Sequence, residues 1–269
     1  MDIFVKADFE VTVHTTQSRG DATKKCIESA GEYDRIVCAG GDGTLDEVVS
    51  GVMASSVRCP VGYIAAGSTN DFGNSVGIPP AMLEAARTAA GDHTFLCDVG
   101  RFDDNYFVYV AAFGIFTDAS YVTDQNLKNM FGHAAYVLQA ISTIWDIKSF
   151  RMQVEYDGNV IYDEFIFGMV TNSKSVGGFT AFMPGDISLN DGLFEVTLIR
   201  TPKNPIELNE IIGFFTGLNT DTELVYNFST SKIRLTSPEK VAWTLDGEFG
   251  GDRESVVIQN LPKAIEIIA

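Results

Sequence analysis

Short apolar runs alternate with helical segments along the first hundred residues of this chain. Four runs have the length and the apolar or alternating character of strands: residues 9–14, 36–39, 61–66 and 94–101. Helical spacing lies between them at residues 22–30, 44–54 and 79–90. Nearly continuous apolar strands that alternate with helices indicate a parallel sheet covered on both faces. Residues 1–100 are therefore predicted to form a three-layer α/β domain.

The pattern changes after residue 100. Residues 102–113 have the pattern of a hairpin that turns at residues 103–105, and two helices are expected at residues 117–126 and 128–148. The second helix carries an apolar stripe. Such a stripe indicates core packing or, as the alternative, the lining of an acyl-chain cleft.

Most of the remaining chain predicts strands. They are expected at residues 151–156, 160–170, 193–200, 224–228, 232–236, 241–245 and 255–259, with one helix at residues 205–218. Apolar and polar side chains alternate along residues 151–156, as in a strand with one face on a core and the other in water. Residues 101–269 are therefore predicted to be a mainly antiparallel β-sandwich domain, whose last strand could pack back on the first domain.

Charge and cysteine content narrow the functional class. The chain has 269 residues, of which 45% are hydrophobic, and this is enough apolar material for two domains. Its formal net charge of −17 argues against binding nucleic acid and against permanent attachment to an anionic membrane. The four cysteines lack metal-ligand spacing and are expected to be core residues of a reduced, cytoplasmic protein. No apolar run reaches the length of a membrane span, and no basic region followed by an apolar one opens the chain, so we expect a soluble protein that is not exported.

The second predicted strand leads directly into a glycine turn, Gly40-Gly41-Asp42-Gly43. Glycine permits positive φ and close approach of a ligand to the backbone. The helix that follows, for which Thr44 and Glu47 have the spacing of a capping box, directs its N–H groups and the positive end of its dipole at the turn. A phosphate is the natural occupant. Because Asp42 would repel a phosphate, the turn predicts nucleotide phosphates together with Mg²⁺.

Three aspartates fall at or near the carboxyl ends of predicted strands: Asp42, Asp71 and Asp98. Asp71 belongs to a second polar turn that begins at Gly67. In a parallel α/β sheet these strand ends share one edge, where ligands bind. For a single aspartate an N-cap or turn role is the simpler interpretation, but convergence of three on one edge favours a functional site.

Three motifs together resemble the diacylglycerol kinase catalytic-domain family, which includes bacterial lipid kinases and the sphingosine and ceramide kinases. They are Gly40-Gly41-Asp42-Gly43-Thr44, Gly67-Ser68-Thr69-Asn70-Asp71-Phe72 and Leu245-Asp246-Gly247-Glu248. The first motif also occurs in NAD kinases and phosphofructokinases, whereas the second and third together are specific. The resemblance covers most of the chain.

The resemblance implies an ATP- and Mg²⁺-dependent kinase that phosphorylates the primary hydroxyl of a lipid, most similar to a bacterial diacylglycerol kinase. It implies ATP bound by Thr16, Gly40, Gly41, Asp42, Gly43, Thr44, Leu45, Asp46, Gly67, Ser68, Thr69 and Asn70. Such an enzyme would contact the inner surface of the membrane transiently. No nucleic-acid partner is expected. The resemblance leaves open whether the protein forms a homodimer.

The same resemblance assigns metal and proton-transfer roles. Asp42, Asp71 and Asp98 would hold the catalytic Mg²⁺, partly through water. Asp246 would act as the base toward the lipid hydroxyl, with Glu248 as the other candidate. A structural Mg²⁺ would be bound by Ser188, Asp191 and Leu193, the first and the last through carbonyl oxygens.

Two features depart from the usual pattern of that family. Its members begin with a further strand and helix, of which residues 1–7 could cover only the end. Asp46 stands where the family usually has Asn, which adds negative charge at the helix start and could weaken ATP binding. Two other functions therefore stay open: an NAD kinase-like enzyme, and a catalytically inactive nucleotide-binding regulatory protein.

Overall fold

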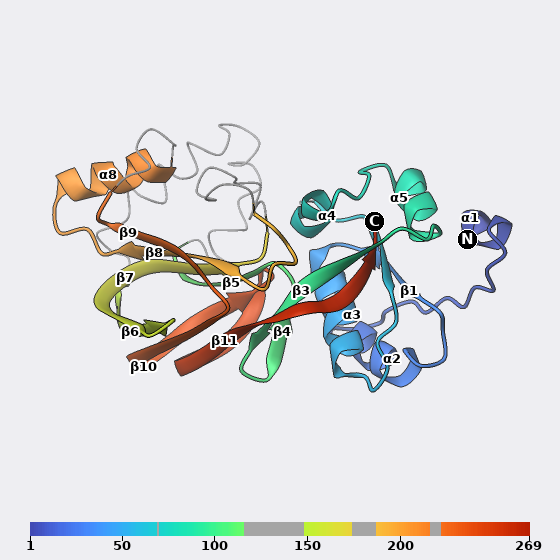
Figure 1. The fold of residues 1–269 in the computed structure, drawn as a ribbon, viewed down its shortest axis with the longest axis horizontal. Helices are drawn as coiled ribbons and strands as arrows, with labels where there is room; N and C mark the ends of the chain where they lie inside the picture. Colours follow the sequence, from blue (N-terminus) through green and yellow to red (C-terminus); the bar gives the residue numbers. More distant parts are fainter. Residues whose placement is uncertain (69, 116–147, 174–186, 216–221) are drawn as a thin grey trace.

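The structure is a computed structural model that describes residues 1–68, 70–115, 148–173, 187–215 and 222–269. The helices expected at residues 117–126 and 128–148, with the apolar stripe of the second, lie outside these ranges but for the last residue. The helices α1 to α5 gather with β1 and β2 at one end of the molecule, and antiparallel strands form the other end (Figure 1). Strands β3 (Thr94–Phe102) and β11 (Glu248–Ile268) run between the two ends.

The α/β part is built around two parallel strands, β1 (Ile36–Gly40) and β2 (Val61–Ala65). The end of β11 pairs with β2, also in parallel. Helix α3 (Asp42–Ala54) packs on these strands, and α2 (Asp21–Ser29) packs on α3. Helix α5 (Met82–Ala89) packs closely on β2, since a Cβ on Gly62 would lie 2.8 Å from the Cβ of Ala89. The short helix α1 (Asp2–Lys6) contacts α5, and α4 (Asp71–Val76) follows the second polar turn.

Two local predictions in this part are wrong. Residues 9–14 form no strand, and within the described residues β1 pairs with β2 alone. The capping box is absent because α3 begins at Asp42, two residues earlier than expected, with Gly41 as its N-cap. The Glu47 carboxylate accepts instead from the backbone N–H of Gly20, at 2.6 Å, and therefore ties α3 to the start of α2.

The other end of the molecule is the predicted antiparallel β-sandwich. Its further elements are β4 (Asn105–Phe107), β5 (Val110–Gly114), β6 (Phe150–Tyr156), β7 (Asn159–Thr171), β8 (Phe194–Arg200), α8 (Pro205–Phe215), β9 (Val225–Thr230) and β10 (Lys232–Leu245). Strands β5, β7, β6 and β10 pair in a closed ring, and β8 and β9 extend it from β7. The ring encloses an aromatic core in which the Phe113 and Trp243 centroids lie 4.9 Å apart.

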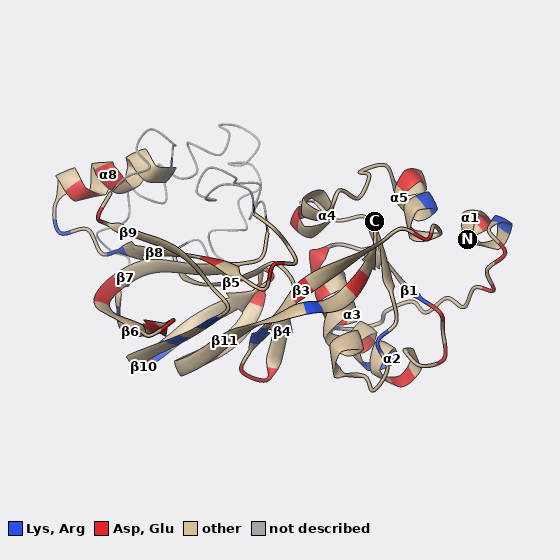
Figure 2. Ribbon diagram, in the orientation of Figure 1, with Lys and Arg blue, Asp and Glu red and all other residues tan. Residues whose placement is uncertain are grey.

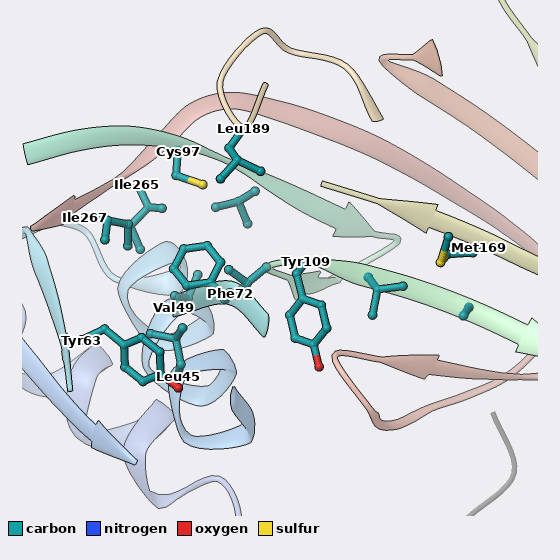
Figure 3. Packing of buried hydrophobic residues seen from close by; sticks show 14 of the residues in the cluster. Leu45, Val49, Tyr63, Phe72, Cys97, Tyr109, Met169, Leu189, Ile265 and Ile267 are labelled. Atoms are coloured by element: carbon teal, nitrogen blue, oxygen red, sulfur yellow. The ribbon is translucent and has the colours of Figure 1, made fainter. Parts of the chain in front are cut away.

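A second apolar cluster joins the two parts of the molecule. Leu45 of α3, Phe72 of α4 and Tyr109, which precedes β5, belong to it together with Ile265 of β11 (Figure 3). The four cysteines are buried and free, as predicted. None of the helices in the described ranges is both long and apolar enough to cross a bilayer. Because one core holds residues of both parts, the polar turns that flank it have fixed relative positions.

Candidate active site

The first two motifs meet through their glycines. A Cβ on Gly41 would lie 3.3 Å from the Cα of Gly67, and a Cβ on Gly67 would lie 2.8 Å from the Cα of Gly41. A Cβ on Gly40 would lie 2.8 Å from the Cβ of Thr44. Contacts this close leave no room for side chains, so the two glycine turns form one backbone surface. The convergence of the turns after β1 and β2 is thereby confirmed.

The second turn is closed by the side chain of Asn70, which has a left-handed backbone with φ 53°. Its Oδ1 accepts from the backbone N–H of Gly67 and its Nδ2 donates to the Gly67 carbonyl, both at 2.9 Å. The backbone N–H groups of Asn70 and Asp71 donate to the carboxylate of Asp42. The acidic starts of α3 and α4 therefore face each other (Figure 2). Ser68 is exposed in this turn, and Thr69 lies outside the described residues.

Asp42 is the first residue of α3 and is half-buried, not exposed as a turn residue would be. Burial raises the pKa of its carboxyl, and the neighbouring charge of Asp71 raises it further. Across the described part of the chain no lysine or arginine forms an ion pair with Asp42. Asp42 therefore has a neighbouring carboxylate and no described cationic partner. This arrangement suits a hard divalent cation with oxygen ligands.

The third motif forms the turn between β10 and β11. Asp246 has φ 49° and is only 4% exposed. Its carboxylate accepts from the backbone N–H groups of Val108, Tyr109 and Val110, at 2.6, 3.0 and 2.9 Å. Asp246, one of the two candidate bases, is therefore a buried side chain held by backbone donors. Burial nevertheless outweighs these three bonds and raises its pKa to about 6.

Glu248, the first residue of β11, occupies a different position. A Cβ on Gly43 would lie 3.6 Å from its Oε1, so its carboxylate reaches over the first glycine turn. Its Oε2 lies 3.4 Å from the Nη2 of Arg19, and about half of its side chain is exposed. Arg19, which the sequence did not single out, thus brings the loop before α2 to the site. Of the two candidate bases, Glu248 is the one that reaches the first glycine turn.

Three of the residues expected to bind ATP have other surroundings. Leu45 is 1% exposed in the shared core, and its N–H donates to the Gly41 carbonyl at 3.1 Å (Figure 3). The Asp46 side chain is partly buried, and burial together with the nearby charge of Asp246 raises the pKa of its carboxyl. Thr16 is exposed in the loop before α2. Leu45 therefore contributes packing, and Asp46 adds a carboxyl whose pKa is affected by the third motif.

Asp98 does not share the edge that Asp42 and Asp71 occupy. Strand β3 is antiparallel to β11, which is parallel to β2, so the carboxyl end of β3 points to the opposite edge. Asp98 is fully buried in the middle of β3. Its two carboxylate oxygens accept from the backbone N–H groups of Gly192 and Lys263, each at 2.7 Å. The predicted convergence of three aspartates is therefore wrong for Asp98, which holds the loop before β8.

That loop contains the residues expected to bind a structural metal. Asp191 is exposed and accepts from the N–H of Leu193 at 3.0 Å, and the Leu193 carbonyl accepts from Asn260 at 3.1 Å. Ser188 donates to Asn190 at 3.1 Å. The described residues contain no group of three or more His, Cys, Asp or Glu that could hold a metal ion.

Two buried oxygens beside this loop still have no described partner, Oε2 of Glu195 and Oδ1 of Asn260. Burial and the charge of Asp191 raise the pKa of Glu195 to about 7. Carboxylate, amide and carbonyl oxygens are the ligands of Mg²⁺ and Ca²⁺, so the donor set fits such an ion. Neither Glu195 nor Asn260 belongs to a recognisable motif, and no signal in the sequence could have identified them.

Comparisons with known proteins agree with these motifs. Residues 1–102 match the family model described as the diacylglycerol kinase catalytic domain, and residues 110–269 match the YegS C-terminal NAD kinase beta sandwich-like domain. The diacylglycerol kinase of Bacillus subtilis (strain 168) is 33% identical over 250 residues, which cover 92% of this chain and 82% of that protein. The diacylglycerol kinase of Staphylococcus carnosus (strain TM300) is 31% identical over 266 residues, 97% of this chain and 85% of that protein.

A solved structure shows the same similarity in the fold. A structure from Bacillus anthracis str. Sterne, assigned as a diacylglycerol kinase, superposes with a TM-score of 0.83 at 26% identity. The superposition covers 98% of this chain and 88% of the other. The similarity therefore extends over both parts of the fold.

Proposed function

Because this chain belongs to the diacylglycerol kinase family, we propose that it is a lipid kinase that transfers the γ-phosphoryl group of ATP to a primary hydroxyl, with diacylglycerol as the best candidate substrate. The observation that carries the proposal is the meeting of three motifs: Gly41 contacts Gly67, and Glu248 reaches over Gly43. Contact with the lipid surface is expected to be transient, since the net charge of −17 repels anionic lipids.

The start of α3 is the proposed phosphate site. The first N–H groups of an α-helix have no partner within the helix and carry the positive end of its dipole. The glycines of both turns let phosphate oxygens approach this backbone closely. Asp42 and Asp71 would hold Mg²⁺, and the metal would supply neutralisation of phosphate charge when bound. This arrangement would offset the repulsion between the site's carboxylates and a nucleotide triphosphate.

Glu248 is the proposed base. In the transfer step the lipid hydroxyl oxygen forms a bond to the γ-phosphorus, the bond from that phosphorus to the bridging oxygen of ADP breaks, and the hydroxyl proton passes to the Glu248 carboxylate. The products are a lipid phosphate and ADP. A positioned carboxylate is suited to this role because an alcohol is a weak nucleophile.

Glu248 is favoured over Asp246 as the base because its carboxylate has fewer hydrogen-bond partners. A carboxylate offers about four positions for accepted hydrogen bonds. In Asp246 three of them are taken by backbone N–H groups, and the side chain is only 4% exposed. Glu248 is half-exposed and has only the partner Arg19 among the described residues. We therefore assign Asp246 to holding the turn and Glu248 to accepting the proton.

A structural cation beside Asp191 and Glu195 is part of the proposal. Replacement of Asp191 by alanine should abolish most of the rise in melting temperature that Mg²⁺ produces, because bound metal stabilises only the folded state. Binding at a hundredfold excess over the dissociation constant is worth about 2.7 kcal/mol. We would measure thermal unfolding of both proteins in Mg²⁺ and in EDTA. Asp104→Ala, which removes an exposed carboxylate elsewhere, is the control, and an equal response of the Asp191 variant and wild type would remove this metal site.

The proposed function is tested with γ-labelled ATP and Mg²⁺, a panel of lipids in mixed micelles, and NAD in parallel. Thin-layer chromatography then shows which molecule carries the label. We expect label on a lipid with a free primary hydroxyl. Label on NAD would identify the NAD kinase-like alternative. Binding of ATP with no labelled product would identify an inactive nucleotide-binding protein.

A further inference from the structure

Arg19, in the loop before α2, has no role in the mechanism given above. Its Nη2 lies 3.4 Å from the Oε2 of Glu248. The other oxygen of that carboxylate, Oε1, would lie 3.6 Å from a Cβ on Gly43 in the first glycine turn. The guanidinium and the glycine turn therefore adjoin the two oxygens of one carboxylate, and Arg19 lies beside the site where the motifs meet.

The charge of Arg19 is unusual for its surroundings. Within the described residues, only Glu248 among Asp42, Asp46 and Glu248 has a basic side chain at ion-pair distance. A nucleotide triphosphate adds negative charge at this place, so a nearby cation is attracted to it. Arginine suits a phosphate in particular, because the N–H groups of its planar guanidinium match two phosphate oxygens at once.

The backbone beside Arg19 is held in place, whereas its side chain can turn. The N–H of the next residue, Gly20, donates to Oε1 of Glu47 on α3 at 2.6 Å, and the N–H of Asp21 donates to the Ser18 carbonyl at 3.2 Å. The Arg19 side chain is 70% exposed, and Glu248 is its partner among the described residues. An exposed ion pair adds little to stability. The guanidinium can therefore exchange Glu248 for a ligand at little cost and without movement of the loop.

We propose that Arg19 is a nucleotide-binding residue whose guanidinium donates to oxygens of the γ-phosphate of ATP. This inference rests on the proposed function, in which Glu248 accepts the proton of the hydroxyl that bonds to the γ-phosphorus. A base acts within hydrogen-bond reach of that hydroxyl. The γ-phosphate therefore lies next to Glu248 and within reach of its partner Arg19. When the guanidinium moves to the phosphate, both oxygens of the Glu248 carboxylate become available to the proton.

Calorimetry of nucleotide binding in Mg²⁺, without lipid, tests this assignment. We expect Arg19→Ala to lower the affinity for ATP by about tenfold or more, the usual effect of losing a hydrogen bond between charged groups. The affinities for ADP and AMP should change little, because neither has a γ-phosphate. Arg19→Lys keeps the charge without the fork and should recover part of the loss. Arg87→Ala, which removes an exposed arginine from α5, is the control and should bind all three nucleotides as wild type does.

An affinity of Arg19→Ala for ATP equal to that of wild type would overturn the assignment. An equal loss for ATP, ADP and AMP would also overturn it, because Arg19 would then act away from the γ-phosphate. Lipid labelling by the wild type judges the proposed function separately. A loss specific to ATP without any labelled lipid would support the role of Arg19 and contradict the lipid kinase. Failure of wild type to bind ATP would overturn both.

Discussion

Glu248→Gln is expected to lower the turnover of lipid phosphorylation by about 10²–10⁴-fold, the usual contribution of a positioned base. Glutamine keeps the size of the side chain and can still meet Arg19, but it cannot accept the proton of the lipid hydroxyl. Because Glu248 is half-exposed at the edge of the site, the change should leave the melting temperature and the affinity for ATP nearly unchanged. Steady-state kinetics, calorimetry of ATP binding and thermal unfolding measure the three quantities.

Two variants serve as controls for this prediction. Glu254→Gln removes an exposed carboxylate from the same strand and should keep full turnover. Asp246→Asn would direct an amide NH₂ at backbone N–H groups that now donate to a carboxylate, so it should lower stability as well as activity. If Glu248→Gln keeps wild-type turnover, the proton does not go to Glu248 and the assignment returns to Asp246.

Replacement of Asp42 by alanine is expected to lower turnover by about a thousandfold, because a metal ion that neutralises phosphate charge contributes several kcal/mol to phosphoryl transfer and each 1.36 kcal/mol is a factor of ten. Asp42 stands at the start of α3 beside Asp71, whose charge raises its pKa. Loss of Asp42 should also weaken the dependence of the rate on Mg²⁺ concentration. Initial rates over a range of Mg²⁺ and ATP concentrations check this.

Asp42 also accepts from the backbone N–H groups of Asn70 and Asp71, so alanine could act by loosening the second turn. Asp42→Asn separates the two effects, since its amide oxygen can still accept from this turn while its charge is gone. A metal role predicts that both variants lose activity together. Near-normal turnover in Asp42→Asn would show that the residue serves the turn and not the metal.

The features that the sequence predicts well are local ones. A strand, a glycine turn and a helix follow each other within about 20 residues at Gly40-Gly41-Asp42-Gly43, and both the spacing and the glycine chemistry are readable there. Alternation along β6 correctly predicts an antiparallel strand with Met152 and Val154 buried. Buried free cysteines follow from their apolar neighbours in the same way.

The direction of a strand is not a local property. The run from Thr94 to Phe102 follows a helical segment as the parallel strand before it does, but it pairs with β11, whose paired residues lie more than 150 positions later. Asp98 was therefore assigned to the wrong edge. The capping box predicted at Thr44 and Glu47 is absent for a similar reason. The Glu47 carboxylate accepts from backbone N–H groups at the start of α2, which is distant in the sequence.

The groupings that matter most for chemistry join distant parts of the chain. Asp46 and Asp246 are 200 positions apart, and neither motif indicates that burial raises the pKa of both carboxyls. Glu195 gains significance only because Asp191 lies near it and because its Oε2 is buried without a described partner. Such contacts follow from how the two parts pack through β3 and β11, which periodicity and spacing do not encode.

The most direct test is a single turnover at the site where the three motifs meet. Enzyme preloaded with γ-labelled ATP and Mg²⁺ is mixed rapidly with vesicles that contain diacylglycerol, and labelled phosphatidic acid is followed in the wild type and in Glu248→Gln. Wild type should transfer its bound label to the lipid in a fast phase, whereas Glu248→Gln should hold ATP and transfer it about 10²–10⁴-fold more slowly. Equal fast phases in the two proteins, or no labelled lipid from wild type, would contradict the account.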